Sequence, residues 1–334
     1  MIITQKPSLK FNNGKFRILV VSDLHGGVDY NRQLDAAMEA IVQSTSPDLV
    51  LIGGDTSGPG KNTHSLEELR ILLDGITAPM EKRGIAWAHV FGNHDDNGGV
   101  PNEEQEPVYE SYPHCVSQRG PEDIHGVANY VLPVMSSDGK KIAYNVWGLD
   151  SHDNMQGFSR AYGLPEDTQY VLPEHFCLGR GYDTIHFDQI MWYYRTSLEM
   201  ERKNGARIPA LMYFHIPLPE FVLVYNNREE CGFEGTAREE VGCGELNSGL
   251  FSVCLQRGDV KAIVCGHDHI SDFKGEYCGI TLAYDAGMDY DCYQHDDLRG
   301  GRVFEIDEAN PDKFNTYIVR IRDIMGAAGD KVAQ

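Results

Sequence analysis

Residues 16–25 read FRILVVSDLH, a mostly apolar run that ends in an aspartate and a histidine two positions apart. Such a run, followed by a segment with apolar residues at helical spacing, is typical of a buried strand in an α/β sheet. Four more apolar runs end on polar side chains of the same kind. They are LVLIGGD (49–55), AWAHVFGNHD (86–95), ALMYFHIP (210–217) and AIVCGHDH (262–269). Because open α/β sheets bind ligands at the carboxyl ends of their strands, we expect these five strand ends to converge on one site.

The segments around these runs indicate helices and further strands. Apolar residues at helical spacing predict helices at 31–45, 65–82, 186–204 and about 247–257. A hairpin is predicted at 129–149, and the chain from 279 to 321 predicts three strands with no helix between them. A chain that begins β-α-β-α-β and ends in antiparallel strands is expected to be an α/β protein. We predict a four-layer α/β/β/α sandwich, in which two stacked mixed sheets are flanked by helices.

No internal repeat and no linker divides the 334 residues, so we predict a single domain over residues 1–334. Three segments rich in Gly, Pro and polar residues interrupt the regular pattern, at about 98–127, 151–183 and 226–245. We expect them to be surface insertions that form the walls around the site.

The formal net charge of −21 disfavours nucleic acids as partners, because it repels the phosphate backbone. Two divalent ions would make the site locally positive, and the partner we expect is a small phosphorylated substrate. No apolar stretch approaches the roughly 18 residues of a membrane span, and no signal peptide is visible, so we expect no membrane association and take a cytoplasmic location as the default. The oligomeric state is not determined by these features.

The eight cysteines show no CxxC pair and no regular spacing, which argues against a zinc finger or a redox motif. Free thiols are the default in a reducing compartment. A bridge between Cys231 and Cys243 across a Gly-rich loop is the alternative.

The polar residues at the five strand ends form a ligand set for two metal ions. Carboxylate and amide oxygens together with imidazole nitrogens suit borderline divalent metals such as Mn, Fe, Zn or Ni. Asp55, at the tip of its strand, is the natural bridge because a carboxylate can bind two ions. One ion would take Asp23, His25, Asp55 and His269, and the other Asp55, Asn93, His215 and His267.

Two such ions, about 3.5–4 Å apart, can hold a hydroxide and clamp a phosphoryl group for in-line displacement. His94 lies one position past a ligand and has no ligand role of its own. We predict that it acts on the leaving group as a general acid, or stabilises charge on the phosphoryl oxygens. Asp95 is expected to orient the His94 imidazole through a hydrogen bond.

The ordered set DxH, GD, GNHD, H and GHDH, from Asp23 to His269, resembles the calcineurin-like metallophosphoesterase superfamily in residue type, order and spacing. The stretches FHIPLPEF (214–221), NSGLF (247–251) and GDVKAIVCGHDH (258–269) are similar to the short purple-acid-phosphatase-like branch of plants and fungi. The resemblance implies a β-sandwich flanked by helices and a dinuclear metal centre. True purple acid phosphatases carry a metal-binding Tyr three residues after the Asp of the GD motif, where this chain has Gly58. The resemblance without that Tyr favours a divalent pair over an Fe(III) centre.

Alternatives remain for individual residues and for the function. His186 is the rival of His215, but it lies near a helix start rather than after an apolar strand. Residues 150–152 are expected to form a solvated loop, and the alternative is that they border the pocket, with His152 as a substrate contact. We expect hydrolysis of a phosphate ester, preferably a monoester. The alternatives are a phosphodiesterase acting on a small nucleotide, a metal-dependent nuclease, and a metal-bearing scaffold that binds a partner without turnover.

Overall fold

The computed structural model describes residues 6–58, 63–155, 159–160, 162–163 and 181–331. Within these residues the strands form a five-stranded sheet of order β11-β10-β1-β2-β3 and a six-stranded sheet of order β4-β5-β6-β7-β9-β8. The first sheet consists of β1 (Lys15–Val21), β2 (Leu49–Ile52), β3 (Ala86–His89), β10 (Gly300–Asp307) and β11 (Phe314–Arg320). The second consists of β4 (Tyr130–Met135), β5 (Ile142–Gly148), β6 (Ala210–Tyr213), β7 (Val260–Cys265), β8 (Lys274–Tyr277) and β9 (Ile280–Tyr284).

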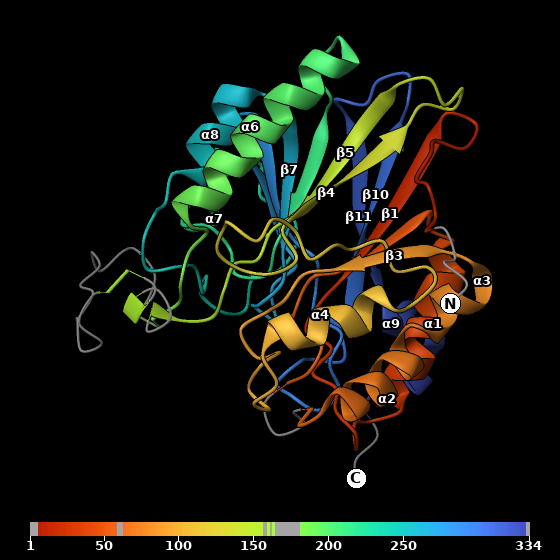
Figure 1. Ribbon diagram of the computed structural model, residues 1–334. Helices are drawn as coiled ribbons and strands as arrows, with labels where there is room; N and C mark the ends of the chain where they lie inside the picture. Colours follow the sequence, from red (N-terminus) through yellow and green to blue (C-terminus); the bar gives the residue numbers. More distant parts are fainter. Residues whose placement is uncertain (1–5, 59–62, 156–158, 161, 164–180, 332–334) are drawn as a thin grey trace.

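Helices cover the outer faces of both sheets, which confirms the predicted α/β sandwich of two mixed sheets flanked by helices (Figure 1). On the side of the first sheet lie α1 (Gln33–Thr45), α2 (Leu66–Ile76), α3 (Ala78–Arg83) and α9 (Ile321–Met325), with α4 (Asn102–Glu110) beside α2. On the side of the second sheet lie α6 (Phe187–Asn204), α7 (Glu220–Asn226) and α8 (Leu250–Arg257).

The strands that precede the polar motifs are parallel neighbours. In the first sheet β1 pairs with β2 and β2 with β3, and in the second sheet β6 pairs with β7, all in parallel register. All residues of β2, β3 and β6 are buried, as expected for strands that are covered on both faces. Because parallel neighbours point the same way, the loops that follow them leave from one edge of each sheet.

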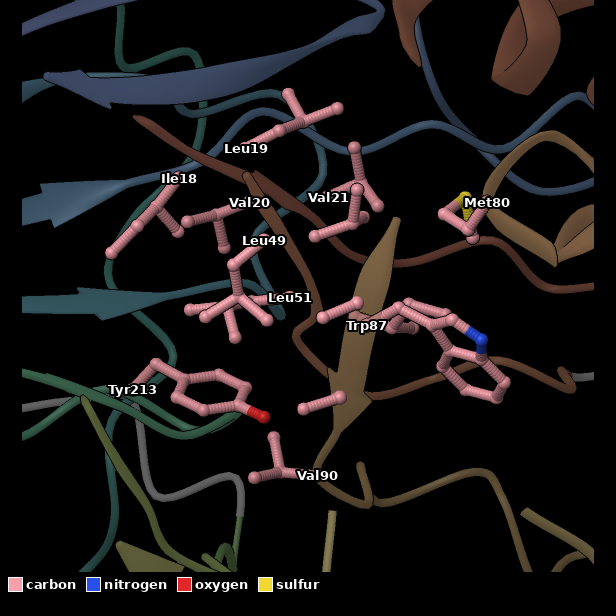
Figure 2. Close-up of a cluster of buried hydrophobic side chains, with 14 of the residues drawn as sticks. Ile18, Leu19, Val20, Val21, Leu49, Leu51, Met80, Trp87, Val90 and Tyr213 are labelled. Atoms are coloured by element: carbon pink, nitrogen blue, oxygen red, sulfur yellow. The ribbon is translucent and has the colours of Figure 1, made fainter. Parts of the chain in front are cut away.

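A continuous apolar core lies between the two sheets. Ile18, Val20 and Leu51 from the first sheet lie in one cluster with Tyr213 from the second (Figure 2). A second cluster fills the space between the six-stranded sheet and its helices, where Trp147 packs edge-on against Tyr193 of α6. The packed sheets and helices thus form the frame that holds the loops at the strand ends.

Three details differ from the sequence-based expectation. The helix predicted over 65–82 ends at Ile76 and restarts at Ala78, because Pro79 has no N–H to continue the hydrogen-bond ladder. The short elements β8, α7 and α9 are not predicted from the sequence, because segments of four to seven residues are too short to show a clear period. Cys231 is a free thiol, so the alternative bridge to Cys243 is not formed.

Part of the predicted 151–183 insertion lies outside the described residues. No helix among the described residues is long and apolar enough to cross a membrane.

Candidate metal centre

The seven predicted metal ligands follow five strands, and all of them except Asn93 belong to two ligand groups that share Asp55. Asp23 and His25 follow β1, Asp55 follows β2 and Asn93 follows β3, whereas His215 follows β6 and His267 and His269 follow β7. All seven are buried, and none exposes more than 7% of its surface. The site therefore lies where the carboxyl-end edges of the two sheets meet, which neither sheet could build alone.

One group consists of Asp23, His25, Asp55 and His269, whose ligand atoms all lie within 4.8 Å of one another. The Nε2 atoms of His25 and His269 are 2.8 Å apart, and His269 Nε2 lies 3.4 Å from Asp23 Oδ1. His25 Nε2 lies 3.7 Å from Asp55 Oδ2. Two carboxylates and two imidazoles thus point at one small volume, which fits a borderline divalent ion.

The other group consists of Asp55, His215 and His267. His215 Nε2 lies 3.2 Å from Asp55 Oδ2 and 3.3 Å from His267 Nδ1. The side-chain oxygen of Asn93 is buried and accepts no hydrogen bond from the described residues. A buried carbonyl oxygen without a donor is costly, and a metal ion would satisfy it. The donor set therefore fits two ions that share Asp55.

The backbone at these strand ends is strained. Asp23, His25, Asp55 and His267 have φ values of 51°, 46°, 49° and 77°, in the left-handed region that non-glycine residues rarely adopt. The turns after β1 and β2 stabilise each other, because the N–H groups of Leu24 and His25 both donate to the Asp55 carbonyl oxygen. Strain of this kind gathers at functional sites, where neighbouring structure imposes it.

Residues around the ligands fix the orientation of two imidazoles. His215 Nδ1 donates to the Gly53 carbonyl oxygen at 2.8 Å, and His269 Nδ1 donates to Asp289 Oδ2 at 2.9 Å. Both rings are thereby held with Nε2 toward the centre, the usual arrangement behind a metal-bound histidine. Asp289 was not predicted from the sequence. The signal that could have found it is a sixth strand end, ITLAYDAGMD at 280–289, which follows β9.

Burial and neighbouring charges shift the pKa values of the histidines in the centre in opposite directions. Burial lowers the pKa of His25 to about 4, and burial together with the nearby His215 holds the pKa of His267 well below its usual value. Burial also acts against protonation of His215, but Asp55 and Asp23 outweigh it and raise the pKa of His215 to about 10. Burial would raise the pKa of Asp55, but His215 holds it well below the ordinary range. An ion that binds here must therefore displace a proton from His215.

His94 lies beside the centre rather than in it. Its ring centroid is 5.7 Å from that of His25, and its backbone N–H donates to Asp55 Oδ1 at 2.8 Å. The expected hydrogen bond from Asp95 to the His94 imidazole is wrong, because His94 Nδ1 instead faces Asn97 Oδ1 at 2.8 Å. Asn97 is thus the orienting residue that sequence reasoning missed.

The Asp95 carboxylate instead accepts hydrogen bonds from the backbone of two loops. It accepts the backbone N–H groups of Gly92, Asp55 and Ser57 at 2.7, 3.1 and 3.0 Å. Burial and the charge of Asp55 raise the pKa of Asp95 to about 7. Asp95 therefore ties the loop after β3 to the loop after β2, and it acts on the ligands through the backbone.

No side chain fits at Gly58. A Cβ atom added there would lie 1.9 Å from Nδ1 of His25. The imidazole of His25 occupies the space that a side chain at position 58 would need, so a tyrosine there requires this ring or the turn to shift. The geometry accounts for the departure from the purple acid phosphatase pattern that the sequence revealed.

A cavity of about 460 Å³ opens beside the centre, and the loop after β3 contributes Gly92 and Asp96 to its wall. His152 and His186 line the same cavity, together with Asp153 and Asp183. Burial and the neighbouring Asp96 raise the pKa of Asp153 to about 6. Of the two rival histidines, His215 lies in the ligand group and His186 in this adjoining wall.

Comparison with known proteins yields a consistent set of relatives. The profile of the family described as calcineurin-like phosphoesterase matches residues 16–271. "Probable inactive purple acid phosphatase 14" of Arabidopsis thaliana is 31% identical over 324 residues, covering 85% of this chain and 73% of the plant protein. "Phosphatase DCR2" of Saccharomyces cerevisiae is 27% identical, with 78% of this chain and 45% of the yeast protein covered. A solved dimetal phosphatase from Danio rerio superposes with a TM-score of 0.53 at 14% identity, over 92% of this chain and 99% of that one, and supports the fold alone.

Proposed function

This chain belongs to the calcineurin-like phosphoesterase family, and on that premise we propose that it hydrolyses phosphate esters at a dinuclear metal centre, with phosphomonoesters preferred. The observation that carries the proposal is the pair of ligand groups that share Asp55. Mn, Fe, Zn and Ni are the candidate ions, because the donors mix oxygen and nitrogen.

Bound by these residues, two divalent ions would polarise the phosphoryl oxygens and make a water molecule a better nucleophile. Hydrolysis forms a bond from the water oxygen to phosphorus and breaks the ester P–O bond, so the departing oxygen must gain a proton. We assign this step to His94 in its doubly protonated form, in which Nδ1–H donates to Asn97 Oδ1 and Nε2–H gives its proton to the departing oxygen. Asp95 keeps the backbone of this loop in register with Asp55.

The charges of the adjoining cavity support a small substrate rather than a nucleic acid. Asp96, Asp153 and Asp183 line it, and the whole chain carries a net charge of −21. A polyanion would be repelled by this surface, whereas a single phosphoryl group needs only the metal centre.

A metal-bearing scaffold without turnover is the second candidate, because the Arabidopsis relative is named "Probable inactive purple acid phosphatase 14". This chain carries His94 and all seven residues of the predicted ligand set, six of them in the two ligand groups, and a scaffold has no chemical need of a leaving-group acid. The complete set favours an enzyme.

The test is hydrolysis of p-nitrophenyl phosphate and bis-p-nitrophenyl phosphate. Metal-stripped protein is reloaded separately with Mn, Zn, Fe(II) and Ni, and the rate is measured on each ester. A metal-restored rate that is higher on the monoester is the expected result, and a higher rate on the diester would indicate the phosphodiesterase instead. Two bound metals with no rate on either ester would contradict the proposal and favour the scaffold.

A further inference from the structure

Three histidines and two aspartates cluster at the cavity, outside the seven predicted ligands of the dinuclear centre, and all of them except Asp188 line its wall. They come from three distant segments: His125, His152, and the stretch that carries Asp183, His186 and Asp188 at the start of α6. The ring centroids of His152 and His186 are 4.1 Å apart. Asp183 and His186 are buried, with exposures of 2% and 3%. The proposed phosphoesterase chemistry uses none of them.

We propose that His152, Asp183 and His186 bind a third divalent ion, of the zinc class, beside the dinuclear centre. One ligand atom from each of the three lies within 4.8 Å of the others. The group faces the 460 Å³ cavity, so a water molecule can complete the coordination. Two imidazoles, a carboxylate and an open position are a common zinc ligand set.

The first observation in favour of the third ion is the spacing of Asp183 and His186. Both carboxylate oxygens of Asp183 lie 3.2 Å from His186 Nε2. Two ligand atoms at normal distances from one tetrahedral zinc ion lie about 3.3 Å apart. The same separation joins His215 Nε2 to Asp55 Oδ2 in the dinuclear centre, at 3.2 Å. Asp183 and His186 are thus spaced as two ligands of one ion.

The second observation in favour of the third ion is the tautomer of His152. Its Nε2 lies 2.9 Å from Gln189 Oε1, an oxygen that can only accept, so Nε2 carries the proton. The orientation of the Gln189 amide is fixed independently, because its nitrogen donates to the Asp150 carbonyl oxygen at 2.7 Å. A neutral imidazole protonated on Nε2 has its lone pair on Nδ1. Histidines that bind metals have this arrangement, with the far N–H held by an oxygen.

The third observation concerns the charges around the proposed ion. The positive end of α6 disfavours a cation, and His186 is the N-cap residue of that helix. Arg160 also lines the cavity, and four carboxylates of the cavity and its surroundings, Asp150, Asp153, Asp183 and Asp188, counter both positive charges. His125, His186 and Asp188 form a second such group, but His125 Nδ1 lies only 2.6 Å from Asp188 Oδ2, closer than the roughly 3.3 Å between two ligands of one zinc ion. We therefore assign the ion to the side of His152.

The test is the metal content of the zinc-loaded, desalted protein, measured by elemental analysis. We expect about three equivalents per chain, and about two in His186→Asn and in His152→Asn. Asparagine suits both positions, because it is a favoured N-cap at 186 and tolerates the φ of 62° at 152. The matched control is His114→Asn, which removes a half-buried histidine bonded to Glu81 at 2.8 Å and is expected to keep about three.

The same measurement in an Asp55→Asn background separates this inference from the proposed function. That variant is expected to keep about one equivalent, which adding His186→Asn removes, whether or not the protein hydrolyses esters. Equal zinc content in the wild type and in both asparagine variants would overturn the third site. Loss of the ion in His125→Asn but not in His152→Asn would overturn the ligand assignment. If His186→Asn fails to fold by circular dichroism, the loop variant His152→Asn decides.

Discussion

At the residue scale, Asp55 links the two halves of the centre. It belongs to both ligand groups, its carboxylate lies 3.2 Å from His215, and its backbone carbonyl oxygen holds the turn after β1. Replacing Asp55 with Asn removes the charge but keeps the shape. We expect the content of both metals of the dinuclear centre to fall together, measured by elemental analysis after loading. Near-normal content would contradict the bridging role, and Asp307→Asn, on an exposed carboxylate, is the control.

A second prediction for a single residue concerns His94, which we expect to act on the leaving group rather than on metal binding. We expect His94→Ala to keep both metals and to lose about 10²–10⁴-fold in rate on esters with poor leaving groups, because proton donation matters most there. The loss on p-nitrophenyl phosphate should be smaller, since that leaving group departs without help. The rates on phenyl phosphate and p-nitrophenyl phosphate, measured in parallel, give the comparison. Full activity on both would remove His94 from the mechanism.

Asn97 offers a matched test of the corrected orientation. The side-chain oxygen of Asn97 accepts from His94 Nδ1 and is the contact that the sequence analysis had given to Asp95. Asn97→Ala should reproduce part of the His94→Ala loss on phenyl phosphate, with metal content unchanged. A rate equal to that of the wild type would show that the imidazole is held by other contacts.

At the element scale, the turn after β2 is shaped by the absence of a side chain at position 58. A Cβ atom there would lie 1.9 Å from His25 Nδ1, so Gly58→Ala must displace the His25 ring or the turn. We expect this variant to lose the metal held by His25 and to keep the one held by His215 and His267. Elemental analysis should then give about one equivalent less than the wild type. Unchanged metal content would mean that the turn relaxes without moving the ligand.

At the scale of the whole molecule, metal binding is coupled to protons and to stability. Asp55 and Asp23 outweigh burial and raise the pKa of His215 from 6.5 to about 10, so this group is protonated at neutral pH before an ion binds. Metal affinity should therefore rise with pH until about 10, with release of a proton. Calorimetry in buffers of different ionisation enthalpy measures that proton. No proton release, and affinity independent of pH, would contradict the assignment.

The same shift has a definite sign for the stability of the metal-stripped protein. Because the pKa of His215 is higher in the folded state, protonation of His215 stabilises the fold. This contribution is fully present below the unfolded-state pKa of 6.5 and is lost as pH rises through the folded-state pKa of about 10. The metal-stripped protein should thus lose thermal stability toward alkaline pH, whereas the loaded protein should lose less because bound ions stabilise the fold. Melting curves with and without metal, recorded across that range, compare the two.

The sequence by itself determined the strand ends and the chemistry that they carry. Buried parallel strands are apolar throughout, so the switch to Asp, Asn and His at residues 23, 55, 93, 215 and 267 marks each strand end locally. The predicted β-α-β-α-β start and antiparallel end also determined the two-sheet architecture. The helix break at Thr77 was not predicted from the sequence, because it depends on a single proline within a strong helical pattern.

Only the tertiary structure decided which groups touch. Asp289 supports His269, Asn97 replaces Asp95 at His94, and His152 approaches His186, and none of these pairs follows from a period along the chain. The wall of the cavity is assembled from loops, whose paths depend on hydrogen bonds between segments far apart in sequence, such as Gln189 to Asp150. Strand ends are local features and can be predicted from spacing. The contacts between loops depend on how the two sheets pack, and that arrangement exists only in the folded molecule.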